Sequence, residues 1–146
     1  MLGDNSQRGI SMVSAYELID QIKDVVDEEI EFGEAFETCR AYEIKTLPMP
    51  LDKIYFCFSL KNITLGYVST DDENVRKTDV EISMNCYYPA TYKAYHAERE
   101  AESIMNLLMS HFSRDASGYT VAGAVYDSTV RAYKVEAVFK LSSLEH

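Results

Sequence analysis

VEISMNCYYP, residues 80–89, is the stretch of sequence that decides the fold. Apolar side chains alternate here with Glu81, Ser83 and Asn85, which is the period of two of a β-strand with one buried face. Pro89 then ends the strand, because proline has no N–H to give to a ladder. From Ala94 the period changes to three and four residues, which predicts an amphipathic helix that covers the apolar face of the strand. Its apolar stripe comprises Ala97, Ala101, Ile104, Met105, Leu108 and Phe112.

A second amphipathic helix is expected near the start of the chain. Ser14 and Glu17 have the spacing of a capping box, and Gly33 is suited to the helix end. The apolar stripe runs over Leu18, Ile19, Ile22, Val25, Val26 and Ile30, and acidic residues fill the other side. Acids late in a helix oppose its dipole. The acidic side is therefore either a solvated surface or a surface that meets Lys or Arg of another chain.

Four further extended segments complete the predicted sheet. They are 36–47; 54–60, continuing to Val68 around Gly66 with a bulge or bend; 119–125; and 130–141. The charged segment 69–79 joins two of the strands, which predicts a hairpin with a long tip. The expected fold class is α+β: a mostly antiparallel sheet of five to six strands with two helices packed on one face, in the order α-β-β-β-α-β-β.

The 146 residues fit one domain, which we place at 14–141. Residues 1–13 are interpreted as a flexible N-terminal arm, and 142–146 as a C-terminal tail whose Leu144-Glu145-His146 resembles the start of a histidine-tag scar. The formal net charge of −10 disfavours docking on a phosphate backbone. We expect no membrane segment, because no apolar run approaches the roughly 18 residues that span a bilayer.

The sequence carries no motif for catalysis, a cofactor or a metal. Its three cysteines are odd in number and lack CxxC spacing, which predicts free thiols in a reducing compartment. His96 and His111 lie on one predicted helix, about 22 Å apart, so they cannot share a metal within a subunit. A pair of Cys86 and His96 would lack a third group to orient the base. We therefore expect a protein that is not an enzyme and holds no cofactor or metal.

The residues that suggest an interface fall in two stretches. The charged segment could contact a neighbouring component, and tyrosines crowd around Pro89, where they suit a surface that is half apolar and half wet. A solvated loop and ordinary sheet packing are the alternatives. The candidate interface residues are Asp71, Asp72, Glu73, Arg76, Lys77, Tyr87, Tyr92 and Tyr95.

Three pieces of the sequence together resemble a known family. They are TLPMPL, residues 46–51, with the strand after it and Gly66; DVEISM, residues 79–84, running to Pro89; and the helix from Ala97 to Leu108 with a final hairpin. With the acidic first helix, this pattern resembles the tail terminator, or tail completion, proteins of long-tailed bacteriophages and prophages, over roughly residues 14–141. The polar N-terminal extension departs from the family.

The resemblance implies a structural protein of the virion. Such proteins form a ring, commonly a hexamer, that caps the tail tube and joins it to the head, and segment 69–79 would be the loop that approaches the bore or a neighbour. The implied partners are further copies of the chain, the tail-tube protein and a head-completion or neck protein. DNA would pass through the bore without specific binding. The implied location is the tail end of the virion, after assembly in the host cytoplasm.

Two alternatives come from other functional classes. One is a small-ligand-binding or enzymatic α+β domain, which requires a deep pocket with convergent polar groups. The other is a neck or head-completion component with a related fold.

Overall fold

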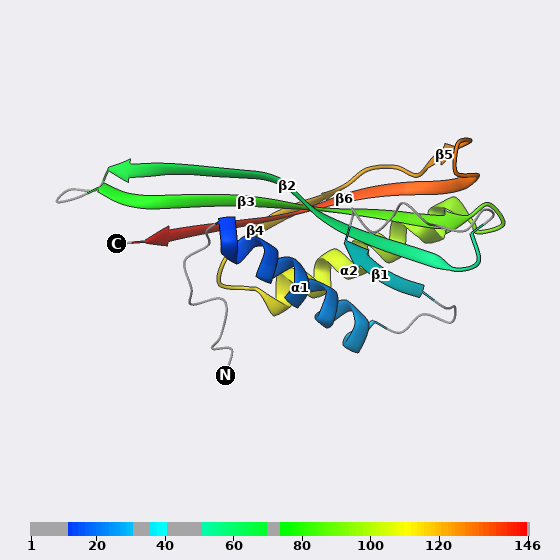
Figure 1. The fold of residues 1–146 in the computed structure, drawn as a ribbon, viewed down its shortest axis with the longest axis horizontal. Helices are drawn as coiled ribbons and strands as arrows, with labels where there is room; N and C mark the ends of the chain where they lie inside the picture. Colours follow the sequence, from blue (N-terminus) through cyan, green and yellow to red (C-terminus); the bar gives the residue numbers. More distant parts are fainter. Residues whose placement is uncertain (1–11, 31–35, 41–50, 70–73, 146) are drawn as a thin grey trace.

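The computed structural model describes residues 12–30, 36–40, 51–69 and 74–145. The chain begins with a helix, continues through three strands to a second helix, and ends with three more strands (Figure 1). The elements are α1 (Met12–Glu29), β1 (Phe36–Arg40), β2 (Ile54–Ser69), β3 (Asn74–Pro89), α2 (Ala94–His111), β4 (Ala116–Val121), β5 (Val125–Asp127) and β6 (Ala132–Glu145).

The strands of the described residues form one six-stranded sheet in the order β1-β2-β3-β6-β4, and β5 also pairs with β6. Every pair is antiparallel except β1 with β2, which run parallel. The predicted α+β class, with a mostly antiparallel sheet and two helices, is confirmed. The parallel first pair was not foreseen, because a period of two does not reveal the direction of a strand's neighbour.

Both helices lie on the same face of the sheet (Figure 1). α1 packs against β1 and β2, whereas α2 packs against β3, β6 and β4. The Tyr88 hydroxyl donates a hydrogen bond of 3.3 Å to the Ala97 carbonyl, which joins the end of β3 to the start of α2. The predicted apolar stripes of both helices are buried, apart from the half-buried Ile30. The facing strand residues are Ile54, Phe56, Phe58, Val80, Ile82, Met84, Cys86, Tyr88, Val135, Ala137, Phe139 and Leu141.

A break in register in β2 moves its apolar side chains from even to odd positions. Leu60 pairs with Ile82, and Ile63 pairs with Val80, so the irregularity lies between Leu60 and Asn62. The extra residue keeps both apolar side chains on the helix side, because directly paired residues share a face. A bulge was therefore correctly expected in this strand, but it precedes Gly66 by several residues.

The segment 69–79 is not the long loop that its charges predicted. β2 and β3 stay paired as far as Ser69 and Asn74, so Arg76, Lys77 and Asp79 belong to β3. These residues pair with β2 on one side and with β6 on the other as far as Arg76 opposite Glu145. Backbone pairing on both sides outweighs the low strand propensity of charged residues.

Several predicted boundaries shift by a few residues. α1 begins at Met12 rather than Ser14, α2 ends at His111, and the strand expected over 119–125 is divided between β4 and β5. β6 continues past the expected end at Leu141 as far as Glu145. Residues 1–11 and 41–47, expected as arm and strand, lie outside the described residues, as does Gly33, the expected helix end. The expected cap is wrong, because Ser14 lies inside α1 rather than at its start. Neither described helix is long and apolar enough to cross a membrane.

Replacing Ile104 by alanine tests the packing of α2 on the sheet. Its side chain has no exposed surface and lies within the core, so the substitution should lower the free energy of unfolding by about 2–5 kcal/mol. Urea unfolding followed by circular dichroism measures the loss. Glu102→Ala, on the exposed side of the same helix, should change stability by less than about 0.5 kcal/mol. Equal effects of the two changes would contradict the assigned helix orientation.

Candidate functional site

The candidate interface residues lie at opposite ends of the sheet. Arg76 and Lys77 lie near the start of β3, whereas Tyr87 lies near its end. Eleven residues of strand separate Arg76 from Tyr87, which corresponds to about 36 Å. Asp71, Asp72 and Glu73 lie outside the described residues. The structure therefore divides the candidates between two distant surfaces.

The first surface is the end of the sheet that extends beyond both helices (Figure 1). We call this part the ribbon: residues 62–69 of β2, 74–79 of β3 and 142–145 of β6, which pair as three strands. β1 pairs with β2 only as far as Phe58, and β4 pairs with β6 only as far as Leu141. Within the described part of the chain, no strand pairs with either outer edge of the ribbon. Such edges can accept another strand.

The ribbon exposes apolar side chains on both of its faces. Leu65 and Tyr67 lie on the helix side, because they pair with Thr78 and Arg76, which share a face with Val80. Their exposed fractions are 58% and 75%. Val68 and Leu144 are exposed on the opposite face. We call three of these side chains the tip group: Leu65, Tyr67 and Val68. Leu144 is left out of it, because it belongs to the segment interpreted as a tag scar.

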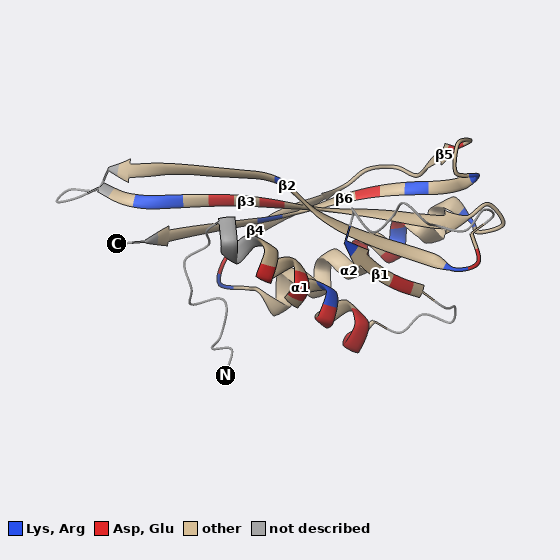
Figure 2. Cartoon of the chain, in the orientation of Figure 1, with Lys and Arg blue, Asp and Glu red and all other residues tan. Residues whose placement is uncertain are grey.

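The charges of β3 change sign along the ribbon. Figure 2 shows the basic pair of Arg76 and Lys77 near the tip and acidic residues next to it along the strand. The Lys77 ammonium lies 3.8 Å from the Asp79 carboxylate, and both side chains are partly exposed. The apolar tip group is thus bordered by charges of both signs, as in the polar rim of an interface.

Contacts within the chain satisfy several acids of α1. Asp20 accepts a hydrogen bond of 2.9 Å from the Arg40 Nε, and Asp27 accepts one of 2.7 Å from the Thr38 hydroxyl. Glu29 lies 3.6 Å from the His111 Nδ1. These contacts attach α1 to β1 and to the end of α2. An external basic partner is therefore not needed to explain Asp20 and Asp27.

The second surface lies at the other end of the sheet, around the start of α2 and the strand β5. Tyr95, Val125 and Tyr126 expose 52%, 65% and 48% of their surface. Tyr126 pairs with Tyr133 and lies on the helix side, whereas Val125 pairs with Lys134 and lies on the opposite face. We call these three side chains, which span both faces, the corner group: Tyr95, Val125 and Tyr126. Apart from Tyr16 on α1 and Leu144 on β6, the large apolar side chains that are exposed in the described part of the chain all belong to the tip group or the corner group.

Two of the predicted tyrosines are engaged within the chain. The Tyr87 ring lies 5.9 Å from the Lys134 ammonium, and burial raises the pKa of its hydroxyl. The Tyr92 hydroxyl donates to the Glu100 carboxylate, 2.5 Å from Oε1. Both side chains are half-buried. Tyr95 is the one of the three that offers most of its surface to a partner.

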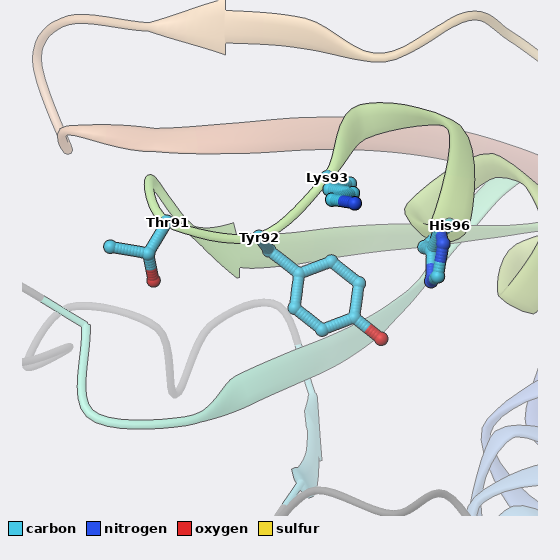
Figure 3. Close-up of a pocket in the computed structure, with 4 residues that line it drawn as sticks. All are labelled: Thr91, Tyr92, Lys93 and His96. Atoms are coloured by element: carbon cyan, nitrogen blue, oxygen red, sulfur yellow. The ribbon is translucent and has the colours of Figure 1, made fainter.

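A small pocket lies at the same end, on the turn between β3 and α2 (Figure 3). It has a volume of about 250 Å³ and is lined by Thr91, Tyr92, Lys93 and His96. Pockets that bury a small-molecule ligand usually exceed about 300 Å³. No cluster of three metal-binding side chains occurs among the described residues.

Cys86, which sequence reasoning considered as a nucleophile, belongs to the helix-side core. It has no exposed surface, and burial together with the nearby Glu100 charge raises the pKa of its thiol. The thiol is therefore protonated at neutral pH, whereas nucleophilic cysteines react as thiolates. This environment fits a packing role.

Tyr92→Phe tests the bond between the turn and α2. The change removes a hydroxyl that donates to a carboxylate, so we expect a loss of about 1–2 kcal/mol in the free energy of unfolding. Urea unfolding at neutral pH measures it. Tyr95→Phe, which removes a hydroxyl from a largely exposed side chain, is the matched control and should have little effect. A loss from the control as large as from Tyr92→Phe would contradict this role.

The tip group and the corner group hold most of the large apolar side chains that are exposed in the described part of the chain. A scan against protein-family models finds no match, and a search of curated proteins finds no significant relative.

Proposed function

We propose that this protein is a structural subunit of a bacteriophage or prophage tail, and that it assembles into a ring that caps the tail tube and joins it to the head. The observation that carries the proposal is the presence of two exposed apolar groups at opposite ends of one sheet. The sequence resemblance to tail terminator proteins supplies the biological setting. The ring would be a hexamer, assembled in the host cytoplasm and retained in the virion.

The position of the two groups favours head-to-tail contacts between copies. In an isologous dimer, one surface meets its own copy, whereas a heterologous contact joins two different surfaces and closes into a ring if the rotation allows. The tip group of one copy would meet the corner group of the next. Each subunit would then use both of its exposed apolar surfaces.

Both outer edges of the ribbon lack a strand partner among the described residues, and they provide a second kind of contact. At the β6 edge, the Ser142 N–H already donates to the Asp115 carbonyl. An added strand can pair with an exposed edge through main-chain hydrogen bonds, while neighbouring side chains provide specificity. The tail-tube protein and a neck or head-completion protein are the other partners that the proposal requires, one on each side of the ring.

Within the described residues, the small-ligand alternative has weaker support. The pocket that these residues line at the corner is small, and its Tyr92 hydroxyl already binds Glu100. A dedicated site usually combines a larger cavity with several convergent polar groups. Exposed apolar side chains outside the pocket are better explained by a protein partner.

Assembly tests the proposal directly. Purified protein should self-associate in sedimentation velocity as its concentration rises, or should cap tubes formed by a phage tail-tube protein, seen by negative-stain electron microscopy. Tyr67→Asp and Val125→Asp should each abolish assembly, because a charge would be buried in the contact. Tyr16→Asp, at an exposed tyrosine of α1, is the matched control and should assemble normally.

Mixing the two variants distinguishes a heterologous, head-to-tail contact from an isologous one. Tyr67→Asp retains an intact corner group and Val125→Asp retains an intact tip group, so a mixture should form one heterologous contact and give dimers without rings. An effect of Tyr67→Asp but not of Val125→Asp would contradict a head-to-tail contact. Wild-type protein that neither self-associates nor caps tubes would overturn the proposed function.

The negative charge leads to a prediction about DNA. With a net charge of −10, the ring should let DNA pass without retaining it, because phosphate binding requires clustered cations. Filter binding with duplex DNA at low salt should show no retention by the protein or by capped tubes. Salt-sensitive binding would contradict passive passage through the bore.

A further inference from the structure

The face of the sheet opposite the helices carries a close pair of thiols. Cys39 of β1 and Cys57 of β2 are register partners in the parallel pair, and their sulfur atoms lie 2.9 Å apart. Neither forms a disulfide in this structure, so both are thiols. They pack in a small apolar cluster with Leu51, Tyr55 and Ala132, separate from the helix-side core.

From this geometry we infer that Cys39 and Cys57 form a reversible oxidation site that closes as an intramolecular disulfide. Neighbouring strands lie about 4.8 Å apart, which falls within the range of about 4.4–6.8 Å between the Cα atoms of disulfide-bonded residues. The sulfur atoms must approach by less than about 1 Å to reach the bond length of about 2.05 Å. The edge strand β1 and its neighbour can therefore be joined with little movement.

The two thiols differ in access to an oxidant. Cys39 is half-buried, whereas Cys57 has no exposed surface. A peroxide or a small disulfide from solution would therefore react first at Cys39, and Cys57 would act as the resolving thiol. This division matches the usual arrangement of a redox-sensitive cysteine beside its resolving partner.

The reaction with hydrogen peroxide balances without another reactant. The Cys39 thiol loses its proton and its sulfur attacks one peroxide oxygen; the O–O bond breaks, and the departing hydroxide takes up that proton, so the products are a sulfenic acid and water. The Cys57 sulfur then attacks the Cys39 sulfur; the S–S bond forms, the S–O bond breaks, and the departing hydroxide takes the Cys57 thiol proton and leaves as a second water. Two thiols and one peroxide thus give one disulfide and two waters, and a dithiol reductant reverses the change.

The bond would fix the edge of the sheet. β1 has only five residues, and β2 is its one strand partner among the described residues. Thr38 and Arg40 connect β1 to α1, so a covalent link from β1 to β2 also restrains the helix. A virion protein leaves a reducing cytoplasm for an oxidising exterior; in that setting, which rests on the proposed function, the bond would form after release.

Cys86 provides an internal control. It lies on the helix side of the sheet, has no exposed surface, and its sulfur is 4.0 Å from the Met84 carbonyl oxygen. It should remain reduced under conditions that oxidise the pair.

The test treats the full chain with hydrogen peroxide or oxidised glutathione, alkylates the remaining thiols and maps the peptides by mass spectrometry. We expect a peptide pair linked through Cys39 and Cys57 with the loss of two hydrogen atoms, while Cys86 is alkylated after unfolding. The midpoint of thermal unfolding should rise by about 5–10 °C on oxidation, because the bond closes a loop. Dithiothreitol should reverse both changes.

Single-cysteine variants distinguish a specific bond between Cys39 and Cys57 from unspecific oxidation of the cysteines. Cys86→Ser should keep the linked peptide and the rise in midpoint, and Cys39→Ser should lose both. Cys57→Ala should leave Cys39 able to form a mixed disulfide with glutathione. Failure to find the linked peptide in wild-type protein, or a link that includes Cys86, would overturn the inference. Neither result depends on ring assembly, so failure here is distinguishable from failure of the proposed function.

Discussion

The difference in length between helices and strands shapes the whole molecule. An 18-residue helix is about 27 Å long, whereas a 16-residue strand spans about 53 Å. α1 and α2 lie against different strands rather than end to end along the sheet. They therefore cover only part of its length, and β2, β3 and β6 continue as the ribbon.

The extent of the helix cover also decides which residues become part of the core. The even-numbered residues of β3 from Val80 to Tyr88 are buried on the helix side. On the same face of the sheet, farther along the ribbon, lie Leu65 and Tyr67 of β2. These two side chains lie on the core face of the sheet but beyond the helices, so they remain exposed. The same face of the sheet therefore carries apolar side chains along its length: they are buried under the helices and exposed in the ribbon.

The sequence was sufficient to predict which side of a helix or strand is buried, where apolar side chains repeat with the period of that element. The stripe of α2 and the alternation in β3 and β6 identified the core correctly, because each repeats over several residues. The charges of Arg76, Lys77 and Asp79 led to the wrong prediction of a loop, since pairing with β2 and β6 holds them in a strand. The separation of Arg76 and Lys77 from Tyr87 follows from the length of β3, which the charged segment concealed. The contact between Cys39 and Cys57 depends on strand order and register, which a local pattern does not contain.

The place of β6 in the sheet has a consequence for folding. β6 follows every other described element in the chain, yet it lies between β3 and β4 and also pairs with β5. The β2–β3 hairpin can form from local contacts, whereas the β3–β6 ladder joins residues more than forty positions apart. Loop-closure entropy makes such distant pairing slow. During synthesis, β4 and β5 therefore emerge before the strand that receives them, and the unfinished sheet exposes an open edge until β6 is inserted.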